Sequence, residues 1–404
     1  MNNFISFNDY AKNNLIKKAN EAIYENDIDK AMELLEKANK TFPKDTTILY
    51  NLAALHIEKG NTEKSEELLK KALKNDPNHI YTLIGLANIV YYRTEDFKKA
   101  YNYLDLALKA NPKSHEVYAA IANLQLLEGN FSEAANKYIE ALKINQNYET
   151  ALNGLATTYN FLGIKLVRQH KFDKAIFYFN QSVSYSGDWP APKLNMARTF
   201  GFLKKYNKAF SIIYDLKNRL GNLSLDSINK DKIDSDYLNT ILMVAISEAK
   251  ILYQKQEIEK SFKIFLSIFA LNEVFPTLNY SLALIYLDKN DFENAQKHIK
   301  KEMEITYNSI KVKTLRYIIY KKLNQASSWE NIHFNIIKKL NPNTYKLFDS
   351  ALLLKKYGME KESNDLFEYA KKLNPMVYEE LLKEKEEEID LLTNITLENN
   401  SVLI

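Results

Sequence analysis

The chain has 404 residues, of which 46% are hydrophobic, and its 55 Lys and Arg residues against 51 Asp and Glu leave a net charge of +4. The charges are interspersed without a long basic run, which argues against nucleic acid as a partner. Because cysteine is absent, disulfides and cysteine-ligated zinc are excluded. Only 9 Gly and 8 Pro are present, too few for the turns of an all-β fold, so the composition favours an all-α protein.

The prolines recur at a nearly constant interval. Pro43, Pro77 and Pro112 are 34 and 35 residues apart, and Pro342 and Pro375 are 33 apart. Proline lacks a backbone donor and clashes with the preceding helical turn, so each of these positions is expected to mark a break between helices. A period of about 34 residues indicates a repeat of helix-turn-helix units.

Each interval contains two apolar stripes with helical spacing. In the second interval the stripes are Leu49, Leu52, Ala53 and His56, and then Leu68, Leu69, Ala72 and Leu73. Spacings of three and four residues place each set on one face of a helix, and Gly60 is expected to end the first helix. Ala53 and Ser65 are small, as the close crossing of two helices requires, because a larger side chain would push the axes apart.

This pattern resembles the tetratricopeptide repeat (TPR) family, whose units carry a small residue, an aromatic, Ala, an aromatic or Leu, Ala and then Pro. The matching residues of the first five units are Ala19, Ile28, Ala31, Leu35, Ala38 and Pro43; Ala53 to Pro77 as above; Ala87, Phe97, Ala100, Leu104, Ala107 and Pro112; Ala122, Gly129, Phe131, Ala134, Tyr138 and Ala141; and Ala156, Tyr159, Phe172, Ala175 and Phe179. Those of the later units are Ala197, Phe200, Tyr206 and Ala209; Ala249, Ile258, Ser261 and Phe265; Ala283, Tyr286, Phe292 and Ala295; a degenerate ninth unit at 310–342; and Ala351, Gly358, Ser363, Phe367, Ala370 and Pro375. The resemblance implies a right-handed α-solenoid of about ten repeats.

Two places depart from the period. The fifth unit carries about seven extra residues at 164–171, two helical turns, so its first helix is expected to lengthen in phase. Residues 216–236 are rich in Asn, Asp, Ser and Lys and predict a polar linker. We therefore expect an N-terminal array at 1–215, the linker at 216–236, a more degenerate C-terminal array with a capping helix at 237–393, and a flexible tail at 394–404.

The resemblance also implies a binding surface, because the first helix of each TPR unit lines the concave side of the superhelix. The residues expected on the exposed face of those helices are Asn20, Tyr24, Tyr50, Asn51, Tyr81, Ile84, Asn88, Tyr91, Asn123, Asn153, Asn160, Arg198 and Lys250. Aromatic rings beside carboxamides suit an extended peptide, whose backbone amides can both donate and accept. The alternative is compositional, since Asn is common throughout the chain and an exposed polar residue is often simply solvated.

The charged residues at the expected binding positions indicate which kind of peptide segment can bind. The TPR domains that grip a C-terminal carboxylate use two asparagines and three cations, and Asn20 and Asn51 match the asparagines. Ile16, Tyr81 and Gly85 stand where the cations belong, so this clamp is rejected for the first units. Arg198 and Lys250 indicate instead an acidic partner segment near the middle of the array.

No catalytic pattern is found. His115-Glu116 begins a metalloprotease-like string, but Ala119 replaces the second histidine, and no glycine-rich phosphate loop occurs. We expect no enzyme activity, no cofactor and no metal. The N-terminus lacks a signal-peptide pattern and the most apolar run, 264–275, is too short to span a bilayer, which predicts a cytoplasmic protein without membrane insertion.

The function predicted from the sequence is an adaptor or scaffold that binds a partner peptide or helix in the concave groove. The alternative is a structural subunit of a larger assembly, such as a bacterial envelope or flagellar one, that uses convex and terminal surfaces.

Overall fold

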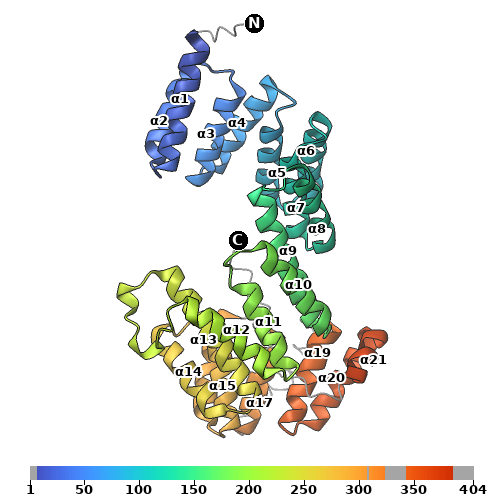
Figure 1. Ribbon diagram of the computed structural model, residues 1–404. Coiled ribbons are helices and arrows are strands. Elements are labelled where there is room, and N and C mark those ends of the chain that lie inside the picture. Colours follow the sequence, from blue (N-terminus) through green and yellow to red (C-terminus); the bar gives the residue numbers. More distant parts are fainter. Residues whose placement is uncertain (1–6, 307–308, 324–342, 385–404) are drawn as a thin grey trace. The chain divides into compact units, whose positions relative to one another are not determined.

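The fold is all-α, as the sequence predicts. A computed structural model describes residues 7–306, 309–323 and 343–384, and in these ranges it contains α-helices, two short 3-10 helices and no strand (Figure 1). The backbone contacts divide the chain into two compact units, residues 1–158 and 159–404, here called the first and second units.

The first unit is a series of antiparallel helix pairs stacked in chain order. Its helices are α1 (Phe7–Tyr24), α2 (Ile28–Thr41), α3 (Thr46–Glu58), α4 (Thr62–Asn75), α5 (Ile80–Thr94), α6 (Phe97–Ala110), α7 (His115–Glu128), α8 (Phe131–Ile144) and the first half of α9 (Glu149–Arg168). In every pair the odd-numbered helix comes first.

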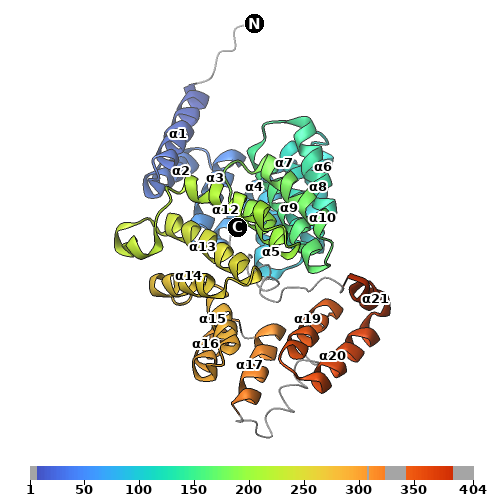
Figure 2. The same ribbon diagram turned by 60° about the horizontal axis from the view of Figure 1, so that its bottom comes forward.

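The second unit continues the alternation. Its elements after α9 are α10 (Phe172–Tyr185), α11 (Ala191–Phe202), α12 (Tyr206–Arg219), η1 (Leu225–Ser227), η2 (Lys230–Lys232), α13 (Ser235–Gln254), α14 (Ile258–Leu271), α15 (Leu278–Asp288), α16 (Phe292–Ile305), α17 (Ile310–Lys322), α19 (Thr344–Lys356), α20 (Glu360–Leu373) and α21 (Pro375–Glu384). Figures 1 and 2 show α17 between α15 and α19 within this unit.

The turn inside each helix pair that the structure describes in full has one residue in the left-handed backbone region. These residues are Asn26, Gly60, Glu95, Gly129, His170, Lys204, Gln256, Asn290 and Gly358, with φ between 51° and 83°. The next residue is the N-cap of the even-numbered helix, and in that position Asp27, Asp96 and Asp291 accept a backbone N–H. The backbone therefore repeats the same turn conformation even where the glycine of the sequence pattern is missing.

Small residues stand where the helices of a pair cross, as the repeat pattern predicts. Ala53 and Ser65 are buried at the crossing of α3 and α4. In the second unit Ser261 Oγ donates to the carbonyl oxygen of Ala249 at 2.7 Å, and Ser363 Oγ to that of Ala351 at 2.8 Å. A serine hydroxyl on the even helix can reach the backbone of the odd helix only where the two axes lie close together.

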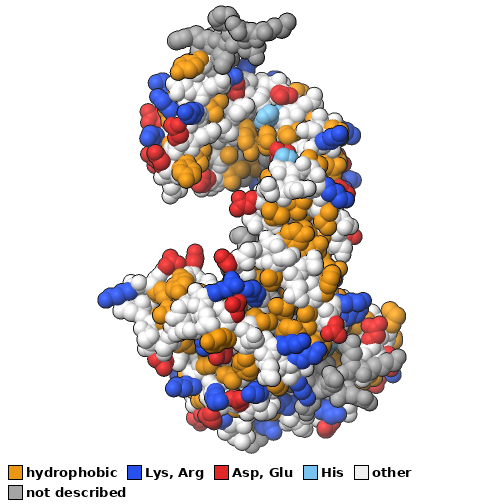
Figure 3. Space-filling model, viewed as in Figure 1, with side chains coloured by type: hydrophobic (Ala, Val, Ile, Leu, Met, Phe, Trp, Pro, Cys, Tyr) orange, Lys and Arg blue, Asp and Glu red, His pale blue; other side chains and the backbone are white. Residues whose placement is uncertain are grey.

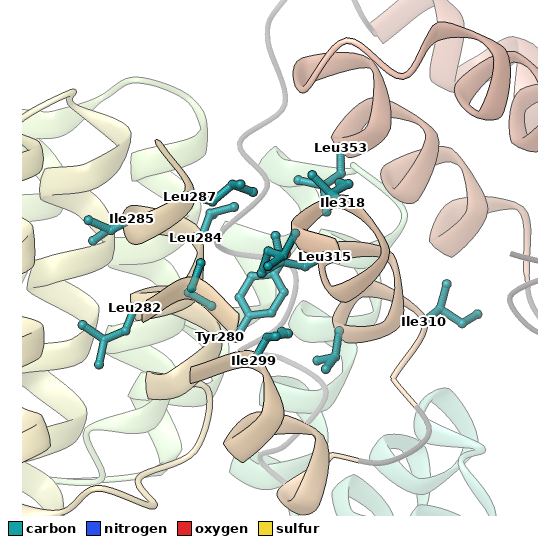
Figure 4. Packing of buried hydrophobic residues seen from close by; sticks show 14 of the residues in the cluster. Tyr280, Leu282, Leu284, Ile285, Leu287, Ile299, Ile310, Leu315, Ile318 and Leu353 are labelled. Atoms are coloured by element: carbon teal, nitrogen blue, oxygen red, sulfur yellow. The ribbon is translucent and has the colours of Figure 1, made fainter. Parts of the chain in front are cut away.

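The largest core belongs to the second unit. It runs from Leu242 in α13 to Leu381 in α21, and Figure 4 shows Tyr280 of α15 beside Leu315 of α17. Almost every residue of α15 between 278 and 287 is buried, so this helix is covered on all sides rather than on one. The odd-numbered helices of the second unit thus pack against one another as well as against their even-numbered partners.

The two irregular places of the sequence take defined forms. Helix α9 is 20 residues long, against 14 for α7, and its added part buries Ile164 and Val167 in phase. The polar segment 216–236 starts in α12 and holds η1 and η2, and Leu225 packs on the large core. It lies inside the second unit, whereas the two compact units meet in sequence at residue 158, within α9.

Several sequence expectations fall outside the described residues. These are the part of the ninth repeat at 324–342, which includes Pro342, the end of the capping helix after residue 384, and the tail at 394–404. Helix α21, from Pro375 to Glu384, occupies the start of the expected capping helix.

Limited trypsin digestion should make its first cut among the described residues within 216–236. Lys230 and Lys232 are exposed there, and between α12 and α13 the backbone forms only 3-10 turns, which open more readily than paired helices. Mass spectrometry of the first fragments checks this expectation. First cuts inside a helix pair would mean that the segment is held as firmly as the repeats.

Candidate functional site

The odd-numbered helices of the first unit carry an exposed face, and most of the residues expected to bind a partner lie on it. Those that are exposed or half-buried are Asn20, Tyr24, Tyr50, Asn51, Tyr81, Ile84, Asn88, Tyr91, Asn123 and Asn153. Tyr24 has 95% of its surface exposed and Tyr81 has 40%. Figure 3 shows hydrophobic side chains gathered beside histidines on this unit.

Three rings meet where α3 faces the start of α5. The ring centroids of Tyr50 and Tyr81 are 5.9 Å apart, and His79 lies 6.0 Å from Tyr50 and 5.9 Å from Tyr81. Gly85 lies beside this group, where a Cβ would press on Leu69 at 3.1 Å and would only make ordinary contact with the Tyr50 ring at 3.8 Å. Burial raises the pKa of Tyr50, and its electrostatic interaction with Tyr148 adds to this rise.

A second pair of rings adjoins the first three. His115, at the start of α7, makes an edge-on contact with Tyr148, with centroids 4.6 Å apart. The Asn145 side-chain nitrogen lies 3.2 Å from His115 Nε2, and its oxygen accepts from the Asn147 backbone N–H. This orientation makes Nε2 the acceptor and puts the proton on Nδ1. Together, Tyr50, His79, Tyr81, His115 and Tyr148 are here called the ring cluster.

One carboxylate belongs to this surface. Glu116 accepts a hydrogen bond from the Tyr81 hydroxyl at 2.8 Å and from Ser114 Oγ at 2.6 Å, and His115 Nδ1 lies 3.5 Å away. Burial alone would raise the pKa of Glu116, but the hydrogen bonds outweigh it and hold the pKa below its ordinary value. The bond to Glu116 in turn raises the pKa of Tyr81 to about 12. Glu116 is therefore an anion beside the aromatic rings of the ring cluster.

The remaining first-unit residues differ in how firmly they are held. Tyr91 packs on Phe97 with ring centroids 5.0 Å apart, and Asn123 Oδ1 accepts from the buried hydroxyl of Tyr138. Asn20 and Tyr24 line a shallow hollow on α1 together with Asn13, Ile16, Lys17, Glu21 and Glu25. Asn123 thus has a structural role beside any contact with a partner.

Three predicted site residues are not on an exposed face, and there the prediction was wrong. Asn160, Arg198 and Lys250 are buried in the second unit, with 4% of Arg198 and 0% of Lys250 exposed. The positions of these residues in α9, α11 and α13 are covered by protein, and α11 and α13 pack directly on each other. A repeat position that faces solvent in the first unit faces protein in the second.

The buried polar groups of the second unit bind one another. Asn195 Nδ2 donates to Asn160 Oδ1 at 2.8 Å, and Arg198 donates to Asn195 Oδ1 at 2.6 Å. Lys250 Nζ lies 2.7 Å from Thr277 Oγ1. Burial lowers the pKa of Lys250 well below its ordinary value and that of Arg198 to about 10. These two cations therefore cannot supply the exposed basic site that the sequence indicated for an acidic segment.

Sequence reasoning missed His79, His115, Glu116 and Tyr148. His79, His115 and Tyr148 are 36 and 33 residues apart, close to the repeat period, and each stands at the entrance to an odd-numbered helix. A search for ring residues at that recurring position would have found them. No comparable signal marks Glu116, which looks like an ordinary acidic residue in the first turn of a helix.

Comparison with known families decides the identity of the repeat. Three models described as tetratricopeptide repeat match residues 22–87, 89–150 and 276–307. This chain therefore carries tetratricopeptide repeats. Such repeats generally mediate contacts between proteins, and TPR proteins are typically scaffolds without catalytic activity.

Relatives of this TPR protein are distant. A TPR repeat-containing protein of Methanocaldococcus jannaschii is 24% identical over 85% of this chain, which spans only 52% of that relative. Among solved structures, PilF of Pseudomonas aeruginosa is 20% identical, with a TM-score of 0.42 over 54% of this chain and 95% of its own. A tetratricopeptide repeat protein of Parabacteroides merdae is 18% identical, with a TM-score of 0.41 over 65% of this chain and 94% of its own.

Within the described ranges, no three His, Asp or Glu side chains are grouped so that they could hold a metal ion. None of the helices in those ranges combines the length and the apolar character that crossing a membrane requires.

Proposed function

We propose that this TPR protein is an adaptor or scaffold whose first unit binds an extended segment of a partner protein along the exposed face of α1, α3, α5, α7 and the start of α9. The observation that supports this most is the contrast between the two units. Large side chains such as Tyr24 and Tyr81 are exposed on the odd-numbered helices of the first unit, whereas α15 is covered on all sides. A soluble domain exposes such aromatic side chains in groups mainly where a partner covers them.

The chemistry of this face suits a peptide backbone. Tyrosine rings provide apolar area with a polar tip, and asparagine amides can donate to and accept from a partner's main chain. Asn51 on α3 is half-buried, and Asn88 on α5, Asn123 on α7 and Asn153 on α9 are exposed. Successive repeats would therefore offer amides to an extended chain at regular intervals.

The test replaces Asn51, Asn88 and Asn153 together by alanine. Asn123 is left intact, because its side-chain oxygen accepts from the buried Tyr138 hydroxyl and its loss would also destabilise the fold. Peptides selected from a random library displayed on phage, with the full chain as bait, serve as ligands. Each lost pair of hydrogen bonds is worth roughly 0.5–1.5 kcal/mol, so the triple variant should bind the selected peptides about tenfold or more weakly.

The control is Lys70→Ala, a change on the outer helix α4 that should leave affinity unchanged. Thermal unfolding must show that the triple variant is at least as stable as wild type, so that a loss of affinity reports on binding. Equal affinity of the triple variant and wild type would move the binding site to the outer or terminal surfaces, as in a structural subunit of a larger assembly.

A further inference from the structure

The exposed face of the first unit has an uneven distribution of charge. Glu116 is the carboxylate of the ring cluster, and its polar contacts are with Tyr81, Ser114 and His115. Among the described residues no lysine or arginine forms an ion pair with it. Elsewhere in the unit acidic side chains do have such partners, as Glu66 has Lys70 and Arg93.

The surroundings of Glu116 resemble the environment that binds an organic cation. The tyrosine rings present π-faces, and the hydroxyls of Tyr50, Tyr81 and Tyr148 are near enough to influence one another electrostatically. A cation over an aromatic ring is attracted by its quadrupole, and a partly desolvated carboxylate strengthens that attraction. Glu116 is mostly buried, with 19% of its side chain exposed, so it is shielded from solvent yet reachable.

We propose that the ring cluster and Glu116 receive a lysine or arginine side chain of the bound segment. The inference rests on the function proposed above and adds the chemistry of the partner: an extended segment with a cationic side chain at one fixed place. Charge complementarity favours this occupant over an acidic segment, because an acid would meet Glu116 directly and find no exposed cation in the cluster. The apolar stem of the cationic side chain would lie along the rings.

The experiment selects a phage-displayed random-peptide library on three immobilised full-length proteins: wild type, Glu116→Gln and Glu63→Gln. Glutamine keeps one acceptor oxygen, and its NH2 group can donate to the hydroxyl oxygen that faces the other position. The first variant therefore removes the charge and keeps one hydrogen bond to each of Tyr81 and Ser114, one of them with donor and acceptor exchanged. Glu63 is exposed on α4, away from the ring cluster, and its replacement changes the net charge by the same amount. Thermal unfolding verifies that all three proteins are folded.

Wild type and Glu63→Gln should enrich peptides with Lys or Arg at one position, and Glu116→Gln should lose that preference. A selected peptide is then compared with its analogue in which the basic residue is glutamine. In wild type the exchange removes the ion pair between the basic residue and Glu116, so binding should weaken about tenfold. The Glu116→Gln variant lacks this ion pair already, so the exchange should hardly affect its binding.

The outcomes separate this inference from the proposed function. Peptides selected on the wild-type protein that show no preference for Lys or Arg, and yet bind the triple asparagine variant more weakly, would overturn the cationic subsite and leave the proposed peptide-binding function standing. An equal loss on exchange in wild type and Glu116→Gln would do the same. A library that yields no binding peptide would overturn both.

Discussion

Gly154→Ala should lower the free energy of unfolding by about 2 kcal/mol, although alanine is the better helix former. A Cβ at position 154 in α9 would stand 2.3 Å from Cζ, 2.4 Å from Cε1 and 2.6 Å from the hydroxyl oxygen of Tyr138. That ring is fully buried in the first unit and its hydroxyl is bound to Asn123, so it cannot withdraw without breaking other contacts. Overpacking of this severity costs about 3 kcal/mol, against a gain of about 1 kcal/mol in helix propensity.

The effect of Gly154→Ala on the free energy of unfolding should change sign when the Tyr138 ring is removed, which makes the prediction specific to this contact. In a Tyr138→Leu background the three nearest atoms are gone, and Gly154→Ala should then stabilise the protein by about 1 kcal/mol. Asn153→Ala, on the exposed neighbour, should show the same small gain without any second change. Urea unfolding of the single and double variants measures all of these values. A loss that persists in the Tyr138→Leu background would place its cause elsewhere than in the contact with this ring.

The architecture could be read from the sequence because the repeat depends on local rules. Small residues such as Ala53 and Ser65 are required at each helix crossing, and prolines such as Pro77 and Pro112 lie between consecutive repeats. Both patterns span no more than one repeat length, so they can be recognised in the sequence without knowledge of the tertiary structure. The same locality explains why the exposed first-unit positions, from Asn20 to Asn153, were placed correctly on their helices.

Exposure in the second unit could not be predicted in this way. Periodicity identifies the face of a helix that packs on its own partner, but not whether other helices cover the opposite face. In the second unit that face is closed by contacts between distant residues: Lys356 Nζ lies 3.0 Å from the Tyr253 hydroxyl and 3.2 Å from Asp288. Such pairs, 103 and 68 residues apart in sequence, leave no periodic trace. Lys250 was therefore assigned to a groove, although it is buried.

Acid should weaken the second unit through His298, which is buried in α16 with 6% of its surface exposed. Its Nδ1 lies 2.8 Å from Asn279 Oδ1, and Asn279 Nδ2 donates to the Glu273 carbonyl, which fixes Nδ1–H as the donor. Its ring stacks on that of Tyr286 at 5.4 Å. Burial, and secondarily the nearby cations Lys297 and Lys301, lower the pKa of His298 to about 4.

The direction of the pH effect follows from proton binding. Between the unfolded pKa of about 6.5 and the folded pKa of about 4, the unfolded state binds more protons, so stability is lost as the pH falls through this window. One pKa unit corresponds to about 1.4 kcal/mol, which gives a loss of about 2 kcal/mol between pH 7 and pH 5. His298→Phe keeps the ring stack and removes the titration. It should therefore be less stable than wild type at pH 7, by about 1 kcal/mol for the lost hydrogen bond, and more stable at pH 5. Urea unfolding of both proteins at the two pH values measures the difference, and a difference that does not change with pH would show that His298 is protonated as readily in the folded chain as in the unfolded one.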